Sequence, residues 1–157
     1  MTTAADDITT LESQEHRLVL DHFDNDDAWA LGSLLTDLAR ERNLAVTISI
    51  RRGAQRLFHC ALPGTSADND AWLDRKCRVV ERYGEASFLV GARFRAKGRT
   101  FEDSSRLDPD TYAAHGGAFP LRLRGTGVIG AVAVSGLAQA DDHALVVEAL
   151  ERFLRPA

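Results

Sequence analysis

The sequence predicts an α+β domain with a largely antiparallel sheet of about five strands flanked by helices. Three observations predict it: two segments have the pattern of β-hairpins, a lone short strand precedes them, and amphipathic helices flank both. The chain has 157 residues, which suits one compact core. We therefore expect a single domain over residues 1–157, with residues 1–8 disordered.

The strongest helix pattern lies at residues 24–43. Asp24 or Asn25 can cap its free amide groups, and four leucines recur at helical spacing to make an apolar stripe: Leu31, Leu34, Leu35 and Leu38. Before this helix, residues 8–16 predict a short helix and residues 17–23 a short strand.

Two hairpins supply the remaining predicted strands. Residues 44–62 alternate in polarity around a turn at Gly53, and residues 118–136 do so around Gly125. The last strand is rich in small and β-branched residues, and its glycines suit close backbone packing.

Four helices complete the predicted order. Residues 69–84 end at Gly84, residues 85–98 end at Gly98, and residues 139–154 form an amphipathic helix that closes the chain. Residues 108–117 predict a short helix with Asp108 as its cap and Pro109 at its first position. This order of elements is profilin-like or PAS-like, and such folds often hold small ligands without fixing which one.

Composition excludes several classes of protein. The net charge of −4 argues against nonspecific binding to nucleic acid, and no window approaches the roughly 18 apolar residues that a membrane helix needs. The first ten residues lack the basic and apolar regions of a secretory signal. Cys60 and Cys77 have no CxxC spacing and are expected to be buried free thiols. We therefore predict a cytoplasmic protein without membrane or nucleic-acid partners.

No catalytic set is complete. The sequence His115-Gly116-Gly117 is of the kind that donates backbone N–H groups to an oxyanion, but Ser135 lacks the flanking glycines of a GxSxG nucleophile elbow. A triad of Ser135, Asp141 or Asp142, and His143 would be crowded into nine positions. We assign no catalytic residue.

Metal chemistry has equally little support. None of the five histidines belongs to an HxxxH or HExxH pair, so no metal ligand is assigned. The absence of CxxCH excludes covalent haem, whereas noncovalent haem through one histidine stays open, and the cofactor is unknown.

Two groups of residues favour ligand binding. Trp72, Arg75 and Lys76 recur over about one helical turn, where the two cations suit a carboxylate or phosphate. The alternative is an ordinary helix surface, paired with nearby acids or with an adjacent subunit. The second group is His115 with Gly116 and Gly117: the glycines are expected to end a helix and to leave His115 facing a pocket. His115 and His143 both lie near loops beside the second hairpin, where they could meet.

Several ordered motifs carry a resemblance to a known family. "FDNDDAWALG", "ALPGTSADNDAWLDRKCRVVERYG", "YAAHGGAFPLRL" and "VIGAVAVSGLAQADDHALVVEAL" together resemble the GlcG/HbpS-like proteins, in the branch labelled haem-degrading domain-containing proteins. The resemblance covers the chain from Leu18 onward. It differs at Ala138, where similar proteins usually have proline, which puts the geometry of that loop in doubt.

The resemblance implies a profilin-like fold and a symmetric homo-oligomer. It also implies a ligand pocket at the positions that match the family motifs: Trp72, Arg75, Lys76, His115, Gly116, Gly117, Ser135, Gly136, Gln139 and His143. We therefore expect an oligomeric binding protein for a small anionic or haem-like ligand. The alternatives are a haem-degrading enzyme and a module for assembly or partner binding, so enzymatic activity is left open.

Overall fold

A four-stranded antiparallel sheet forms the centre of the molecule. The structure is a computed structural model that describes residues 7–155. The strands follow the order β2-β1-β4-β3, and each neighbouring pair is antiparallel. Their bounds are β1 Thr47–Arg52, β2 Gln55–Ala61, β3 Ala118–Leu123 and β4 Gly127–Ser135. Both predicted hairpins are confirmed.

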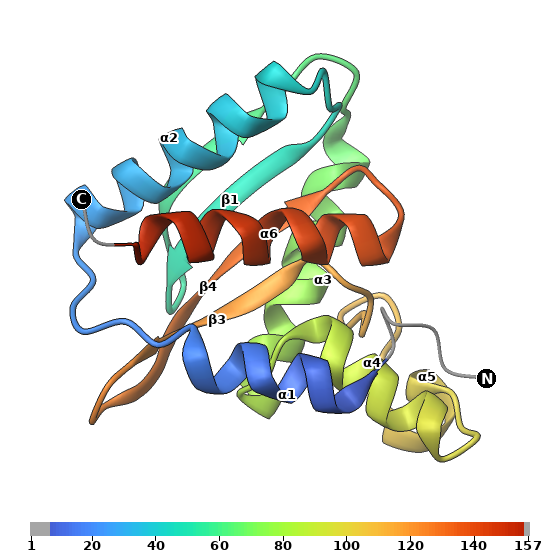
Figure 1. The fold of residues 1–157 in the computed structure, drawn as a ribbon. Helices are drawn as coiled ribbons and strands as arrows, with labels where there is room; N and C mark the ends of the chain where they lie inside the picture. The colour runs from blue at the N-terminus through green and yellow to red at the C-terminus, as the bar shows by residue number, and fades with distance from the viewer. Residues whose placement is uncertain (1–6, 156–157) are drawn as a thin grey trace.

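Helices cover both faces of this sheet. Figure 1 shows α2 and α6 side by side over one face and α3 behind the other, with α1 and α4 beside the sheet. The helices are α1 Ile8–Arg17, α2 Asn25–Glu41, α3 Ala67–Tyr83, α4 Ser87–Ala96, α5 Phe101–Ser105 and α6 Gln139–Phe153. The predicted α+β, profilin-like class is confirmed. None of the helices within residues 7–155 has both the length and the apolar character needed to cross a bilayer.

Strand β4 separates two apolar layers because its side chains alternate between the faces. Val132 and Val134 join the core under α2 and α6, whereas Ala131 and Ala133 pack with Leu73 and other α3 residues. Small side chains on the second face let α3 lie close to the sheet. Cys77 is buried in this second layer and Cys60 on β2 is half-buried, so only one of the two predicted buried thiols is fully buried.

Local signals position the long helices. Asp24 caps α2 through a capping box with Asp27, and Ser66 caps α3 through a capping box with Asn69. Helix α3 ends at Gly84, which has a left-handed φ of 71°. These elements lie where the sequence predicted them, because capping depends on near neighbours in the chain.

The predicted strand at residues 17–23 is wrong, and its absence reduces about five strands to four. This segment makes a single parallel bridge between Leu20 and Leu123, with Leu20 N–H donating to the Arg122 carbonyl at 2.8 Å. Leu18, Leu20 and Phe23 are buried, as an apolar strand would be. The pairing stops because the chain turns at once into the cap of α2.

The predicted helix at residues 108–117 is also wrong. Asp108 caps one turn, where its carbonyl accepts from Thr111 and Tyr112, and the chain is then irregular up to β3. Tertiary bonds take the backbone groups that a helix would use: Ala113 N–H donates to the Arg75 carbonyl of α3 at 3.2 Å.

Two smaller differences concern helix ends. The five-residue α5, capped by Thr100, was not predicted. Of the expected disordered start, residues 1–6 lie outside the described part of the chain, whereas Asp7 caps α1 and Ile8 begins it.

Candidate functional site

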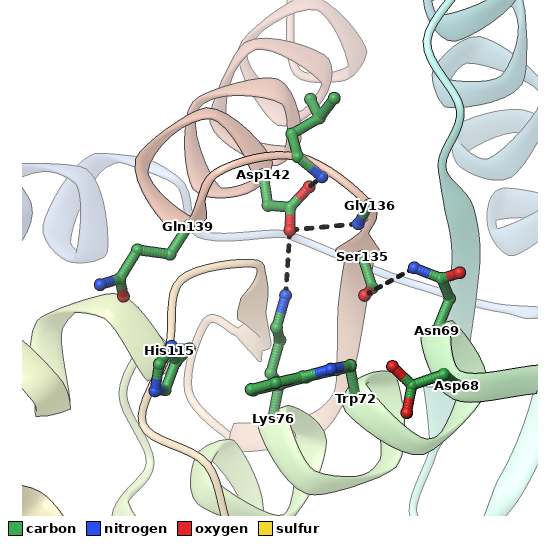
Figure 2. A pocket seen from close by; sticks show the side chains of 10 residues that line it. Asp68, Asn69, Trp72, Lys76, His115, Ser135, Gly136, Gln139 and Asp142 are labelled. Carbon is green, nitrogen blue, oxygen red and sulfur yellow. Dashed lines mark hydrogen bonds and ion pairs between the residues drawn. The ribbon is translucent and has the colours of Figure 1, made fainter. Parts of the chain in front are cut away.

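A pocket of about 300 Å³ opens beside the loop that contains His115 (Figure 2). Its walls come from the first half of α3, from the loop before β3, and from the turn between β4 and α6. The lining residues are Asp68, Asn69, Trp72, Lys76, His115, Ser135, Gly136, Leu137, Gln139 and Asp142.

A buried ion pair lies at the centre of this pocket. Lys76 Nζ donates to Asp142 Oδ2 at 3.1 Å and to the Val134 carbonyl at 3.1 Å. Lys76 is 3% exposed and Asp142 is 2% exposed. Burial lowers the pKa of Lys76 and raises the pKa of Asp142, and each shift is opposed by the charge of the partner. The pair joins α3 to α6 and leaves little net charge at this point.

The same carboxylate holds the turn between β4 and α6. Asp142 Oδ1 accepts from Leu137 N–H at 2.9 Å, and Oδ2 accepts from Gly136 N–H at 3.4 Å. Gly136 has a φ of 152°, and a side chain there would collide with the Ala45 carbonyl. Ala138 has a φ of −59°, close to the value that proline requires, so the alanine leaves this turn with a backbone that proline could also adopt.

Two aromatic rings form one wall of the pocket. The Trp72 and His115 ring centroids lie 5.2 Å apart at an interplanar angle of 60°. Trp72 precedes Lys76 by four residues, so one face of α3 presents both. The packing of His115 removes part of its hydration and lowers the pKa of its imidazole, against the opposing charge of Glu102. His115 is therefore neutral at neutral pH.

The glycines after His115 are required by close contacts. The Gly116 N–H donates to Gln139 Oε1 at 3.0 Å, and a side chain on Gly116 would collide with the Gln139 carbonyl. Gly117 has a φ of 137°, and a Cβ there would lie 2.6 Å from Lys76 Nζ. The expectation that these glycines end a helix is wrong, because they instead let the loop approach α6 and Lys76.

Most of the ten residues singled out from the sequence come together here. Six of them line the pocket: Trp72, Lys76, His115, Ser135, Gly136 and Gln139. Gly116 and Gly117 support its wall, as described above. Arg75 and His143 are not among the lining residues.

Arg75 lies on the outer side of the aromatic wall. Its guanidinium carbon is 4.0 Å from the centroid of the Trp72 ring, and its Nη1 donates to the Pro109 carbonyl at 3.4 Å. Lys76 is already paired with Asp142, so the two cations do not converge on one shared anion site. Neither of the sequence alternatives, an anion site shared with Arg75 or a helix surface paired with nearby acids or an adjacent subunit, describes the buried Lys76.

His143 lies in the core. Its Nε2 is 2.7 Å from Gln14 Oε1, and its ring packs against Phe88 and Phe119 at 5.1 and 6.1 Å. Burial lowers the pKa of His143 to about 4. His115 and His143, whose sequence positions allowed them to meet, pack against different rings in the structure. Asp142 pairs with Lys76 rather than with His143, so no triad with Ser135 forms.

Sequence reasoning missed four residues of the pocket lining: Asp68, Asn69, Leu137 and Asp142. Asn69 caps α3 through Oδ1, which accepts from Ser66 N–H, while its Nδ2 donates to Ser135 Oγ at 3.4 Å. The Ser-x-x-Asn capping pattern signalled its place at the start of a helix. Nothing local signals that Asp142 meets Lys76, which lies 66 residues earlier.

The charges of the lining limit what the pocket can accept. Lys76 is balanced by Asp142, and Asp68 adds a further negative charge. A ligand with several negative charges therefore finds little compensation. Within residues 7–155, no three histidine, cysteine, aspartate or glutamate side chains gather to hold a metal ion.

An enclosed haem does not fit this pocket. His115 offers one neutral imidazole that suits iron, but a cavity of about 300 Å³ lies at the lower limit for small-molecule sites and takes only part of a porphyrin. The only cation of the described lining, Lys76, is already paired and is not free to neutralise propionates.

Comparison with known proteins identifies the relatives of this chain. A family model described as haem degrading protein HbpS-like matches residues 23–151. A UPF0303 protein of Streptomyces avermitilis is 68% identical over 94% of this chain and 90% of its own length. A UPF0303 protein of Rhizobium etli is 47% identical over 97% of this chain and 92% of its own.

Solved structures share the fold. The crystal structure of the Ybr137w protein superposes with a TM-score of 0.86 at 30% identity, over 93% of this chain and 88% of that chain. A heme complex of PduOC superposes with a TM-score of 0.69 over 82% of this chain and 93% of that chain. At 17% identity the latter likeness concerns the fold alone.

Proposed function

Because the chain belongs to the HbpS-like haem degrading protein family, we propose that it is a binding protein for a small planar ligand held beside His115. The observation that carries this proposal is an aromatic wall, Trp72 and His115, facing a polar centre at Lys76 and Asp142. The flat part of the ligand lies against the rings. Its polar head bonds to the amine of Lys76 or the hydroxyl of Ser135.

The charge balance narrows the ligand to a neutral molecule or one with a single negative charge. A monoanion is compatible because Arg75 lies beside Trp72 at the rim, where it can approach a carboxylate. A polyanion would meet Asp68 and Asp142 without a free cation in the lining. Benzyl alcohol and benzoate are matched probes, since they share a ring and differ in charge.

Fluorescence titration tests this proposal. Trp29 is 68% exposed and lies on α2, so a Trp29→Phe variant leaves Trp72 as the reporter. We expect benzyl alcohol to change Trp72 emission saturably, and His115→Ala to weaken its binding. If neither probe changes the emission at millimolar concentration, the pocket is not a site for such ligands.

Haem is the second candidate, favoured by the heme complex of the similarly folded PduOC. Only an edge of the porphyrin would enter the pocket, with His115 as the single imidazole. Titration with hemin tests this candidate. A Soret shift that disappears in His115→Ala supports haem binding through His115, whereas an unshifted Soret band shows that haem is not a ligand. Degradation would need a reductant and would give a defined tetrapyrrole product, while bleaching abolished by catalase indicates peroxide damage.

The predicted homo-oligomer has a separate test. If the chain serves assembly, the charge at Arg75 belongs to a contact between copies or partners, and Arg75→Glu changes the mass measured by light scattering. A ligand site at the rim instead predicts an unchanged mass and altered benzoate binding.

A further inference from the structure

The chain contains two lysines, Lys76 and Lys97, among its 19 basic residues. Lys97 is exposed at the end of α4, whereas Lys76 is buried in the pocket. Apart from two pairs formed by histidine, the other ion pairs found among residues 7–155 take their cation from arginine, as in Arg51–Asp74 and Arg122–Glu15. Arginine is the better residue for a buried ion pair, but it stays protonated and cannot act as a nucleophile. The lysine at this one buried position therefore needs an explanation beyond pairing.

The amine of Lys76 has capacity left for a ligand. A lysine ammonium has three donors, and two of them go to Val134 O and Asp142 Oδ2. Figure 2 shows the amine between His115 and Gln139 on one side and Ser135 on the other. The missing side chain of Gly117 keeps the space beside Nζ free.

Asp142 is suited to take a proton from this amine. Burial disfavours both charged forms, so it lowers the pKa of Lys76 and raises that of Asp142. Moving the proton across the 3.1 Å between Nζ and Oδ2 converts a buried ion pair into a neutral pair. Removal of water from a lysine amine favours its neutral form, which is the form that attacks a carbonyl carbon.

We propose that Lys76 captures a small aldehyde or ketone as a reversible imine. This inference rests on the proposed function, because the carbonyl compound occupies the same pocket. The neutral amine attacks the carbonyl carbon and forms the C–N bond, while the carbonyl oxygen receives the proton held by Asp142. The resulting carbinolamine loses water with a second proton from the nitrogen. Overall, one ammonium and one carbonyl give one protonated imine and one water, with no oxidant or reductant.

The pocket defines the class of carbonyl compound. Trp72 and His115 favour a flat or aromatic substituent, and the volume of about 300 Å³ limits its size. Ser135 and Gln139 provide hydrogen-bonding partners for a polar group of the ligand. An aryl aldehyde with at most one negative charge meets these conditions.

Reductive trapping tests the imine on the wild-type protein. Benzaldehyde and cyanoborohydride at neutral pH convert an imine into a stable benzylamine, and peptide mass spectrometry reports the rate at each lysine. Lys97 is a built-in control for the reactivity of an exposed amine. We expect Lys76 to be labelled at least about tenfold faster than Lys97, because the pocket holds the aldehyde beside the Lys76 amine. In concentrated urea this ratio should fall to about one.

Two variants distinguish labelling at Lys76 from labelling at Lys97, and the test does not depend on both variants being folded. Lys97→Arg should keep the fast label, and Lys76→Arg should lose it. If Lys76→Arg does not fold, the site-resolved rates on the wild-type protein still decide. Equal or slower labelling of Lys76 in the native protein overturns the proposal.

Benzyl alcohol distinguishes this failure from failure of the proposed function, because it has the same ring and no carbonyl. If it changes Trp72 emission while Lys76 stays unlabelled, imine formation alone is wrong. If it does not bind and Lys76 stays unlabelled, the ligand site is wrong as well.

Discussion

Asp142 and His143 are consecutive residues of α6, yet their side chains lie in different surroundings. Asp142 points into the pocket and pairs with Lys76, while His143 points into the core and packs against Phe88 and Phe119. Burial shifts the pKa of both groups toward the neutral form. Only the pocket side has an opposite charge within reach, so the two sites respond differently to mutation and to pH.

Removal of the pocket cation should have the largest effect. Lys76→Met leaves Asp142 buried without its partner, and we expect a loss of about 3–5 kcal/mol in the free energy of unfolding. Urea unfolding measures it, and the exposed Lys97→Met is the control, expected within about 0.5 kcal/mol of the wild type. If Lys76→Met lowers the free energy of unfolding by less than about 1 kcal/mol, the ion pair between Lys76 and Asp142 does not hold α3 against α6.

The second largest effect should be a loss of stability in acid, caused by protonation of the buried His143. The pKa of His143 is about 4 in the folded protein and about 6.5 in an unfolded chain, so the unfolded state binds the extra proton between these values. Stability from this residue is therefore full above pH 6.5 and falls by about 3 kcal/mol as pH decreases to 4. The measurement is the pH slope of unfolding free energy.

His143→Gln is the matched variant, because it keeps a polar partner for Gln14 and removes the titration. Pocket and surface carboxylates titrate alike in both proteins, so the difference in slope belongs to His143. If the free energy of unfolding depends on pH equally in the wild type and in His143→Gln, His143 is not a buried neutral imidazole.

A side chain at Gly116 should disturb the contact between the loop and α6. The added methyl of Gly116→Ala collides with the Gln139 carbonyl, which we expect to cost about 1–3 kcal/mol and to weaken benzyl alcohol binding. Gly98→Ala is the control: its methyl meets open space, and the cost of about 1 kcal/mol comes from a φ of 68°. Unchanged ligand affinity in Gly116→Ala would show that the loop position does not define the pocket.

His115 should have the smallest effect on stability. It is exposed, so His115→Ala is expected to change the free energy of unfolding by less than about 0.5 kcal/mol. Loss of the aromatic contact should weaken ligand binding by about threefold to tenfold. His143→Ala reverses this pattern, with a stability loss of about 2–5 kcal/mol from a core cavity. If both variants lose a similar amount of stability, His115 and His143 do not differ as a pocket residue and a core residue.

Sequence patterns were reliable where structure is local. The capped helix α2 and the two hairpins were predicted because capping, periodicity and turn glycines act within a few residues. Residues 17–23 and 108–117 were mispredicted although their patterns were clear. In both segments, backbone groups bond to distant elements, at Arg122 and at Arg75 respectively.

The site was predicted in part for the same reason. Trp72 and Lys76 were placed on one helix face by their spacing of four residues, and His115 was expected to face a pocket. His143 was assigned to the pocket although its neighbour Asp142 is the residue that lines it. A shift of one residue around α6 rotates a side chain by about 100°, and only packing decides which one faces inward.

By itself, the sequence determined the class of fold, the long helices, both hairpins and six of the residues that line the pocket. Tertiary structure alone decided that Lys76 meets Asp142, that Arg75 lies outside, and that His143 is buried. The physical reason is the high cost of a buried polar group without a partner. Its partner comes from any part of the chain that folding brings near, and no local pattern records which part that is.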